Sequence, residues 1–329
     1  PSFQEVAEEW FRTWEQDRAP DRQTNTPNQY RATLRMFASF WGQRPVREIT
    51  EADAARFVDL LASLGGHYRS DPKVKQMSFA ELTGKYGGQG KPLSAQSLNR
   101  HVNRLSAVWV HAKRRGLASG ENPFEGLRRS VKRAHKEHFK AWGLDELQRL
   151  LVPPPERRDL HELILVGLFS ALRINEAASL AYEDIKQADG VWFFDITAAK
   201  TEAGVRQVPV HSALSWLVER KRSGKAGRIW PRFRPEGPGQ KPGENASRRF
   251  GYFKKTRGFE DRWKAFHSFR RNVTTQMENA RVPVNEWQEI FGHEKGFTNR
   301  TYSEGLTMAR KAEIIEIIRY PGLSIDPPA

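Results

Sequence analysis

Patterns of helical periodicity fill the first 127 residues of the chain and constrain that part to a helical domain. At the N-terminus, Ser2 and Glu5 have the spacing of a capping box, in which each side chain bonds a free backbone N–H at the start of a helix. Val6, Trp10 and Trp14 follow at intervals that place them on one face of that helix. We interpret these aromatic side chains as part of a packed core.

Three further long helices are predicted in this part of the chain, over residues 27–41, 50–64 and 94–116. Each begins at a residue that favours a helix start and ends at or just before glycine. Residues 65–92 between the last two are polar and rich in glycine, with a short helix expected near Phe79–Leu82. A connection of this length is usually functional or mobile, so it is either a loop that touches a ligand or a tolerated insertion.

The chain is strongly basic, with a formal net charge of +15 and a pI of about 10.1. A soluble protein with this charge most often binds a polyanion such as nucleic acid, and the alternative is a generically basic protein. The charge is concentrated after the helical part, where Glu137 is the single acid among six cations: Arg128, Arg129, Lys132, Arg133, Lys136 and Lys140. This segment is predicted to attract a phosphate backbone in a salt-dependent manner.

Cysteine is absent from the 329 residues, which excludes disulfides and cysteine-zinc sites. No run approaches the ~20 apolar residues of a membrane helix, and the N-terminus has no signal-peptide pattern. We therefore expect an intracellular protein without a membrane partner. Because the chain begins at Pro1 and not at a methionine, we also expect it to be part of a longer protein.

The second half of the chain combines helix patterns with a β-hairpin. Helices are predicted over residues 144–151 and 160–170, and the three prolines after the first would end it. Residues 191–196 and 205–210 have the composition of two strands joined by a turn, and Lys200 lies at the mouth of this hairpin. The pattern favours a mainly helical domain with a small antiparallel sheet.

Four residues of this half have the chemistry needed to break a phosphodiester bond. Arg173 and Arg270 carry guanidinium groups, which bind phosphate oxygens in a bidentate manner and stay charged. His267 lies three residues before Arg270, on the same side of a helical turn. Tyr302 is a candidate nucleophile, although a tyrosine pKa near ~10 means that nearby cations must help it to ionise.

The motifs around these residues resemble those of the tyrosine recombinases, also called phage-type or lambda-like integrases. In chain order they are Ala171-Leu-Arg-Ile-Asn-Glu176, Leu180-Ala-Tyr-Glu-Asp184-Ile185, His267-Ser-Phe-Arg270, and Gly292-His293 with Tyr302 nine residues later. The resemblance is strong from Phe139 to the C-terminus and looser before it. Two positions depart from the pattern, because the family often has glycine at Ala171 and leucine at Phe291.

The resemblance implies roles for three more residues. Lys200 becomes the general acid that protonates the leaving 5′ oxygen, with a simple phosphate contact as the alternative. His293 joins His267 as a proton carrier and hydrogen-bond donor. Glu176 becomes a carboxylate that orients the site. Neither a nucleotide cofactor nor a metal is expected, since there is no phosphate-binding glycine-lysine motif and the histidines lack further ligands at metal spacing.

The resemblance also implies a mainly α fold with a small antiparallel β-sheet in a two-domain architecture. Residues 1–127 would form a helical core-binding domain on DNA, residues 128–140 a basic interdomain linker with DNA contacts from Arg128, Arg129, Lys132, Arg133 and Lys136, and residues 141–329 the catalytic domain. The implied function is site-specific recombination or integration for a mobile genetic element. The enzyme would cut and rejoin double-stranded DNA through a 3′-phosphotyrosyl intermediate, with self-association on DNA into a tetramer.

Two alternatives remain open, namely an enzyme like the type IB topoisomerases, which relaxes DNA, and a catalytically silent DNA-binding module. A second choice concerns the chain end, where four isoleucines crowd into residues 314–318. Such an apolar surface is too wide for an exposed helix. The helix either folds back onto its own catalytic domain or docks into a neighbouring protomer, as the resemblance implies.

Overall fold

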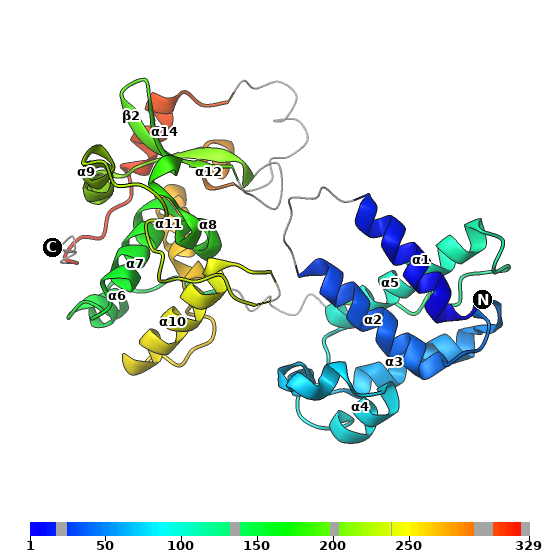
Figure 1. Cartoon of the computed structure of the whole chain (residues 1–329). Helices are drawn as coiled ribbons and strands as arrows, with labels where there is room; N and C mark the ends of the chain where they lie inside the picture. The colour runs from blue at the N-terminus through cyan, green and yellow to red at the C-terminus, as the bar shows by residue number, and fades with distance from the viewer. Residues whose placement is uncertain (18–24, 132–138, 198–203, 238, 293–304, 324–329) are drawn as a thin grey trace. The chain divides into compact units, whose positions relative to one another are not determined.

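The computed structural model describes residues 1–17, 25–131, 139–197, 204–237, 239–292 and 305–323. The chain divides into two compact units, Pro1–His135 and Lys136–Ala329 (Figure 1). Each unit has its own hydrophobic core. This agrees with the sequence, in which a helical pattern is followed by a mixed pattern of helices and strands. In the described parts of both units, every helix is too short or too polar to span a membrane.

In the first unit, the structure describes five α-helices and three short 3-10 turns. The α-helices are α1 (Phe3–Gln16), α2 (Thr26–Trp41), α3 (Glu51–Ser63), α4 (Phe79–Tyr86) and α5 (Ala95–Arg114). The 3-10 turns cover Val46–Glu48, Gly66–Ser70 and Pro72–Lys75. The predicted capping box of Ser2 and Glu5 is confirmed, and Thr50 and Ser94 cap α3 and α5 as expected.

The core of the first unit is aromatic. Phe37 of α2 lies at its centre, with ring centroids of Phe3, Phe57 and Phe124 within 4.6, 4.9 and 5.3 Å. Trp10 and Trp14 are only partly buried, and stack on Tyr30 at the edge of this core. The glycine-rich segment before α5 is more structured than the sequence predicted, because it contains α4 and two of the 3-10 turns.

The second unit contains eight described α-helices and a small sheet. They are α6 (Leu144–Leu151), α7 (Arg158–Ser170), α8 (Ile174–Ser179), α9 (Ser215–Arg222), α10 (Pro242–Thr256), α11 (His267–Asn279), α12 (Val284–Phe291) and α14 (Met308–Ile315). Short 3-10 turns cover Tyr182–Asp184 and Ser212–Leu214. The sheet lies at one end of this unit, and α6 and α10 lie at the other (Figure 1).

The sheet has three antiparallel strands in the order β1-β2-β3. These are β1 (Ile185–Ala188), β2 (Val191–Ile196) and β3 (Arg206–Pro209). The predicted hairpin is confirmed as β2 and β3, with Phe194 opposite Val208 and Ile196 opposite Arg206. Strand β1 was not predicted, and it extends the hairpin to a three-stranded sheet.

Helix α7 forms the centre of the second unit, because almost all of its side chains are buried. It packs against α11, and Gly167 allows the two helices to approach closely. A Cβ atom at Gly167 would lie 2.6 Å from Cζ of Phe266 and 2.9 Å from Cδ2 of Phe269. The close approach brings the C-terminal end of α7 beside the first turn of α11, where the two predicted arginines lie.

The isoleucine-rich helix α14 packs within its own unit. Ile314, Ile315 and Ile318 are fully buried in the core of the second unit, and the helix contacts β2, β3 and α12. The buried His211 hydrogen-bonds the backbone oxygen of Ile318 at 3.1 Å, and this contact holds the segment that follows the helix. Of the two interpretations of this segment, the structure has the one in which the helix folds back onto its own domain.

Candidate active site

Arg173 occupies the short connection between α7 and α8. Helix α7 ends at Ala171, whose φ of 52° is left-handed, and Arg173 is the N-cap residue of α8. A left-handed residue with a Cβ costs about 1–2 kcal/mol, and glycine at this position would avoid that cost. The carboxylate of Glu176, one turn into α8, accepts hydrogen bonds from the backbone N–H and from Nη1 of Arg173, both at 2.8 Å.

Arg270 comes from the first turn of α11 and is almost completely buried, with 4% exposure. Its Nη1 donates to the backbone oxygen of Ala171, and its Nη2 donates to that of Phe291 at 2.8 Å. The close packing of α7 and α11 thus joins the two predicted arginines through the turn that ends α7. Arg173, in contrast, keeps 40% of its side chain exposed, within reach of a ligand.

Three arginines meet at the C-terminal end of α12. Arg206 donates from Nε to the oxygen of Ile290 at 2.9 Å, Arg270 donates to the next oxygen, and Arg173 donates from Nη2 to the oxygen of Gly292 at 2.9 Å. The last carbonyls of a helix lack partners within the helix and carry the negative end of its dipole, so cations are stabilised there. Because consecutive Cα atoms are about 3.8 Å apart, the three guanidinium groups are held close together.

Glu176 is the counter-ion of this cluster. Arg206 donates to it from Nη2 at 2.8 Å and from Nη1 at 3.3 Å, and the Glu176 side chain is only 8% exposed. Burial alone would raise the pKa of this carboxyl, but the hydrogen bonds and charge of Arg206, together with the hydrogen bonds from Arg173, lower it to about 2. Three guanidinium groups and one carboxylate leave a net charge of +2, which suits an anionic phosphodiester.

The ionisation states of Arg270 and His267 follow from their surroundings. Burial and the positive charges of Arg173 and Arg206 lower the pKa of Arg270 to about 9, which still leaves it charged at neutral pH. His267 begins α11, with the ring of Phe139 5.0 Å from its own. Partial desolvation and the charges of Arg270 and Arg173 lower the pKa of His267 to about 4. The imidazole is therefore neutral at physiological pH, with one ring N–H to donate.

The structure brings Arg173, Arg270 and Glu176 together and places His267 one turn before Arg270. Lys200, His293 and Tyr302 lie outside the described residues, as do Lys132, Arg133 and Lys136 of the predicted linker. The chain leads directly from the carbonyl that Arg173 binds, at Gly292, into His293. Lys200 falls in the connection between β2 and β3, the strand that carries Arg206.

The described ends of the predicted linker are anchored to separate units. Arg129 forms an ion pair with Asp59 at 3.0 Å and exchanges backbone hydrogen bonds with the side chain of Asn99, both in the first unit. Lys140 pairs with Asp261 at 2.8 Å in the second unit. Arg128 is exposed. The DNA contacts of these residues remain a prediction.

Arg206 is a site residue that was not predicted from the sequence. A signal was present, because Arg206 alternates with Val208 along a strand, and alternate residues of a strand point to the same face. An arginine on the face that a valine buries requires a buried partner. Here that partner is Glu176.

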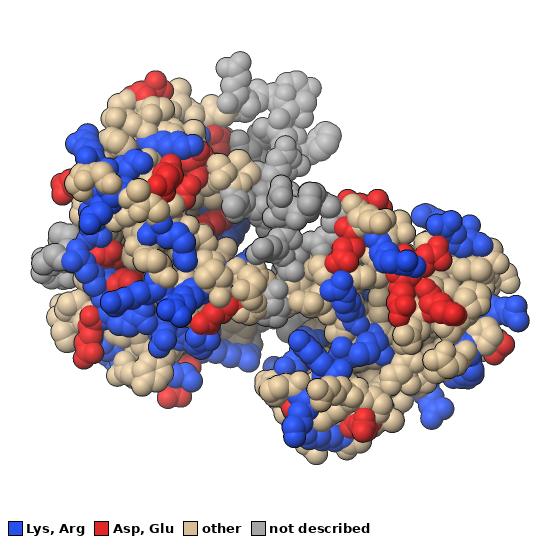
Figure 2. Space-filling view, in the orientation of Figure 1, with Lys and Arg blue, Asp and Glu red and all other residues tan. Residues whose placement is uncertain are grey.

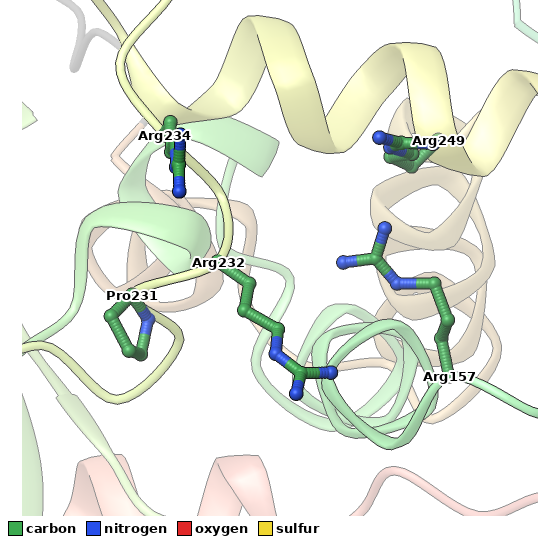
Figure 3. Close-up of a pocket in the computed structure, with 5 residues that line it drawn as sticks. All are labelled: Arg157, Pro231, Arg232, Arg234 and Arg249. Carbon is green, nitrogen blue, oxygen red and sulfur yellow. The ribbon is translucent and has the colours of Figure 1, made fainter.

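A second group of arginines lines a hollow of about 500 Å³ on the same unit, with Pro231 at its edge (Figure 3). Arg157 and Arg232 extend toward the space between them, and Arg234 and Arg249 lie beside it (Figure 3). Of the four, Arg157 is paired with Asp159. Lys and Arg side chains also gather over α7 and α10 on the face of this unit shown in Figure 2. The surface therefore offers positive charge away from the arginine cluster at α12.

The described fold is shared with integrases of known structure. The integrase of transposon Tn1549, solved with transposon right end DNA, has a TM-score of 0.61 and 17% identity, and the match covers 95% of this chain and 98% of that one. Lambda integrase, solved as a dimer on a core site, has a TM-score of 0.59 and 14% identity, with 94% and 100% covered. A lambda integrase tetramer on a Holliday junction also gives a TM-score of 0.59 and 14% identity, with 93% and 80% covered.

No curated protein has a sequence that matches this chain significantly. Residues 144–307, however, match the sequence pattern described as the phage integrase family. That range begins at α6 and contains Arg173, Glu176, Arg206 and Arg270, and it continues through Tyr302. The motifs, the arginine cluster and the matched range agree, and the chain belongs to the phage integrase family, the tyrosine recombinases.

Proposed function

We propose that the chain is a site-specific recombinase that cuts and rejoins double-stranded DNA of a mobile genetic element through a covalent phosphotyrosine. The observation that carries this proposal is the meeting of Arg173 and Arg270 at the end of α12, with a net positive charge and with Gly292 leading toward Tyr302. A phosphodiester that enters this site meets charge on its non-bridging oxygens, where negative charge develops in the transition state.

In the proposed reaction, the oxygen of Tyr302 attacks phosphorus while the bond to the 5′ oxygen breaks. The tyrosine releases its proton to solvent, and the 5′ oxygen gains a proton from Lys200, which we assign as the general acid. The products are a 3′-phosphotyrosyl bond and a free 5′-hydroxyl. Attack by a 5′-hydroxyl of another strand reverses these steps, so rejoining needs no nucleotide hydrolysis.

The two histidines have separate proposed roles. His267 is neutral at physiological pH, so it donates one hydrogen bond to the scissile phosphate without adding charge. His293 follows the carbonyl bound by Arg173 and is assigned a second hydrogen bond. Arg173 supplies the exposed fork that a phosphate oxygen reaches first, and Arg270 supplies a buried and fixed positive charge.

The arginine hollow and the basic linker support binding of DNA beyond the reacting phosphate. Both offer several cations over a surface, as phosphate backbones require. The integrases of similar fold are described in complexes with DNA, including the lambda tetramer on a Holliday junction. We extend that assembly to this chain and propose self-association on DNA, into a tetramer when two sites are joined.

A suicide substrate tests the chemistry without knowledge of the target site. A library of duplexes with randomised sequence and a nick beside each scissile position would lose the short 5′-hydroxyl fragment after cleavage, and would trap the protein covalently. We expect a denaturant-resistant complex with the wild type and with Tyr252→Phe, whose exposed ring is a matched control. Tyr302→Phe should bind DNA normally and form none.

The outcomes separate the alternatives. Covalent attachment by Tyr302→Phe would refute the assignment of the nucleophile. Binding without attachment by the wild type would favour a silent DNA-binding module. Once the trapped sequences identify a site, a substrate pair carrying two copies distinguishes recombination from relaxation, because an enzyme like the type IB topoisomerases would cleave without exchanging strands between the copies.

A further inference from the structure

We infer that Arg206 is a positioning residue for strand cleavage. It acts through Glu176 and the end of α12 on Arg173 and Arg270, which together form the phosphate clamp. The inference rests on the proposed function and assigns a role to a residue outside the predicted catalytic set. Three elements that are separate in the sequence meet at its side chain, namely β3, which carries it, α8, which carries Glu176, and α12.

The hydrogen bonds of Arg206 leave it unsuited to bind phosphate itself. A guanidinium group has five N–H donors. Four hydrogen bonds to protein groups are present: Nε to the oxygen of Ile290, Nη1 to the oxygen of Gly204 and to Glu176, and Nη2 to Glu176. The side chain is 4% exposed. Arg206 is therefore an internal support and not a third member of the phosphate clamp.

Glu176 transmits the effect of Arg206 to Arg173. One oxygen of this carboxylate accepts from Nη1 of both arginines, and the other accepts from Nη2 of Arg206 and from the backbone N–H of Arg173. Removing Arg206 frees half of these contacts, so Glu176 and the guanidinium of Arg173 can rotate away from their present orientation.

Arg206 also shapes the turn that leads to the nucleophile. Gly292 has a φ of 67°, and a Cβ atom there would lie 2.9 Å from Cζ of Arg206. The backbone of Gly292 therefore runs directly against the guanidinium group. Because Arg173 binds the oxygen of Gly292, Arg206 supports both the acceptor and the donor of that hydrogen bond.

The geometry requires an arginine. Its planar fork makes two contacts with a carboxylate while Nε donates in a third direction, toward α12. A lysine supplies one positive charge with three donors on a single atom, so it neutralises Glu176 but cannot hold Glu176, Gly204 and Ile290 together. Arg206→Lys therefore separates the charge of this residue from its shape.

The test measures covalent attachment to a nicked substrate under single-turnover conditions, with saturating protein. The variants are Arg206→Met and Arg206→Lys. The control is Arg228→Met, because Arg228 is partly buried and, like Arg206, donates to backbone oxygens, here those of Ala178 in α8 and of Phe233. DNA affinity and the midpoint of thermal unfolding are measured for each protein.

We expect Arg206→Met to attach about 10²-fold more slowly, the size of loss that follows from an ~1 Å misplacement of catalytic groups. Arg206→Lys should remain at least about tenfold slow. DNA affinity should change by less than about threefold in both Arg206 variants, because Arg206 is not assigned to phosphate binding. The attachment rate of Arg228→Met should also change by less than about threefold. If Arg206→Met does not fold, the lysine variant decides, because it keeps the charge opposite Glu176.

A substrate with sulfur in place of the 5′ bridging oxygen identifies the route. Sulfur leaves without needing a proton, so this substrate rescues defects in the general acid but not defects in the clamp. The inference predicts that both Arg206 variants stay slow on it. Four results would each overturn the inference. They are rescue of the Arg206 variants by the sulfur substrate, an attachment rate of Arg206→Met close to that of the wild type, a wild-type rate in Arg206→Lys, and a loss no larger than that of Arg228→Met. If the wild type itself forms no covalent complex, the proposed function fails instead.

Discussion

Replacing Glu176 by glutamine tests whether the arginine cluster stabilises the second unit through this carboxylate. The pKa of Glu176 falls from its usual 4.5 to about 2. At about 1.36 kcal/mol per pKa unit, this shift corresponds to about 3 kcal/mol of stability at neutral pH. The side chain is 8% exposed, so solvent screens this contribution little. Glutamine keeps the shape but removes the charge, so Glu176→Gln should destabilise the unit by about that amount.

The stabilisation by Glu176 should also depend on pH in a defined direction. Because the folded state has the lower pKa, it binds fewer protons than the unfolded state between pH 4.5 and 2, and stability falls as the pH falls through that interval. The difference between wild type and Glu176→Gln should therefore be full at pH 7 and should shrink below pH 4.5. Glu176 is the group responsible, since glutamine does not titrate.

Native-state hydrogen exchange of amides in α7 and α11 measures this difference within one unit, which matters because a two-domain chain need not unfold in one step. Glu219→Gln, at an exposed position of α9, is the matched control and should change stability by less than about 0.5 kcal/mol. Equal protection of wild type and Glu176→Gln at pH 7, or a difference that grows on acidification, would refute the reasoning.

Three further predictions concern packing and charge. Gly167→Ala should cost about 1 kcal/mol, since overpacking against Phe266 costs about 1–3 kcal/mol and the helix gains about 1 kcal/mol; urea denaturation that shows a stabilised variant would contradict this. Ending the chain before Lys311 removes three buried isoleucines worth about 1.5–3 kcal/mol each, so the second unit should unfold at a lower temperature, and an unchanged melting curve would restore the docking interpretation. Neutralising Arg128, Arg129, Lys132 and Arg133 together should weaken binding to every DNA sequence and flatten the salt dependence by about one unit per lost phosphate contact; a loss confined to one sequence would indicate base reading.

The sequence predicted several helices from local signals at their ends. Helices α1, α3 and α5 begin at serine or threonine caps, and the capping residue alone locates their starts. Strand β1 was missed although it also has a local signal, since Asp189 and Gly190, which join it to β2, both have positive φ, as the two-residue turn of a hairpin requires. The strand's own residues conceal it, because one apolar residue is followed by the exposed polar Lys186 and Gln187.

The sequence predicted the site residues whose side chains are suited to bind a phosphate. Arg173 and Arg270 were identified from their residue types, and Glu176 from the family resemblance, and the structure brings the three together. Arg206 was missed because its role depends on an ion pair with a residue thirty positions away. No spacing rule within one element reveals such a pair, although the alternation with Val208 marked an arginine on a buried face.

Each of the three arginines donates to a main-chain oxygen of residues 290–292, and this has a consequence for mutational scans. No side-chain substitution removes a carbonyl oxygen, so these acceptors for the guanidinium groups remain after any amino-acid change that keeps α12 folded. A scan of single substitutions should therefore find the donors sharply sensitive, while Ile290 and Phe291 respond only through packing. The end of α12 supplies these acceptors whatever its side chains are. Their contribution can be measured only by a chemical change to the backbone, such as an ester in place of an amide, which weakens the carbonyl as an acceptor.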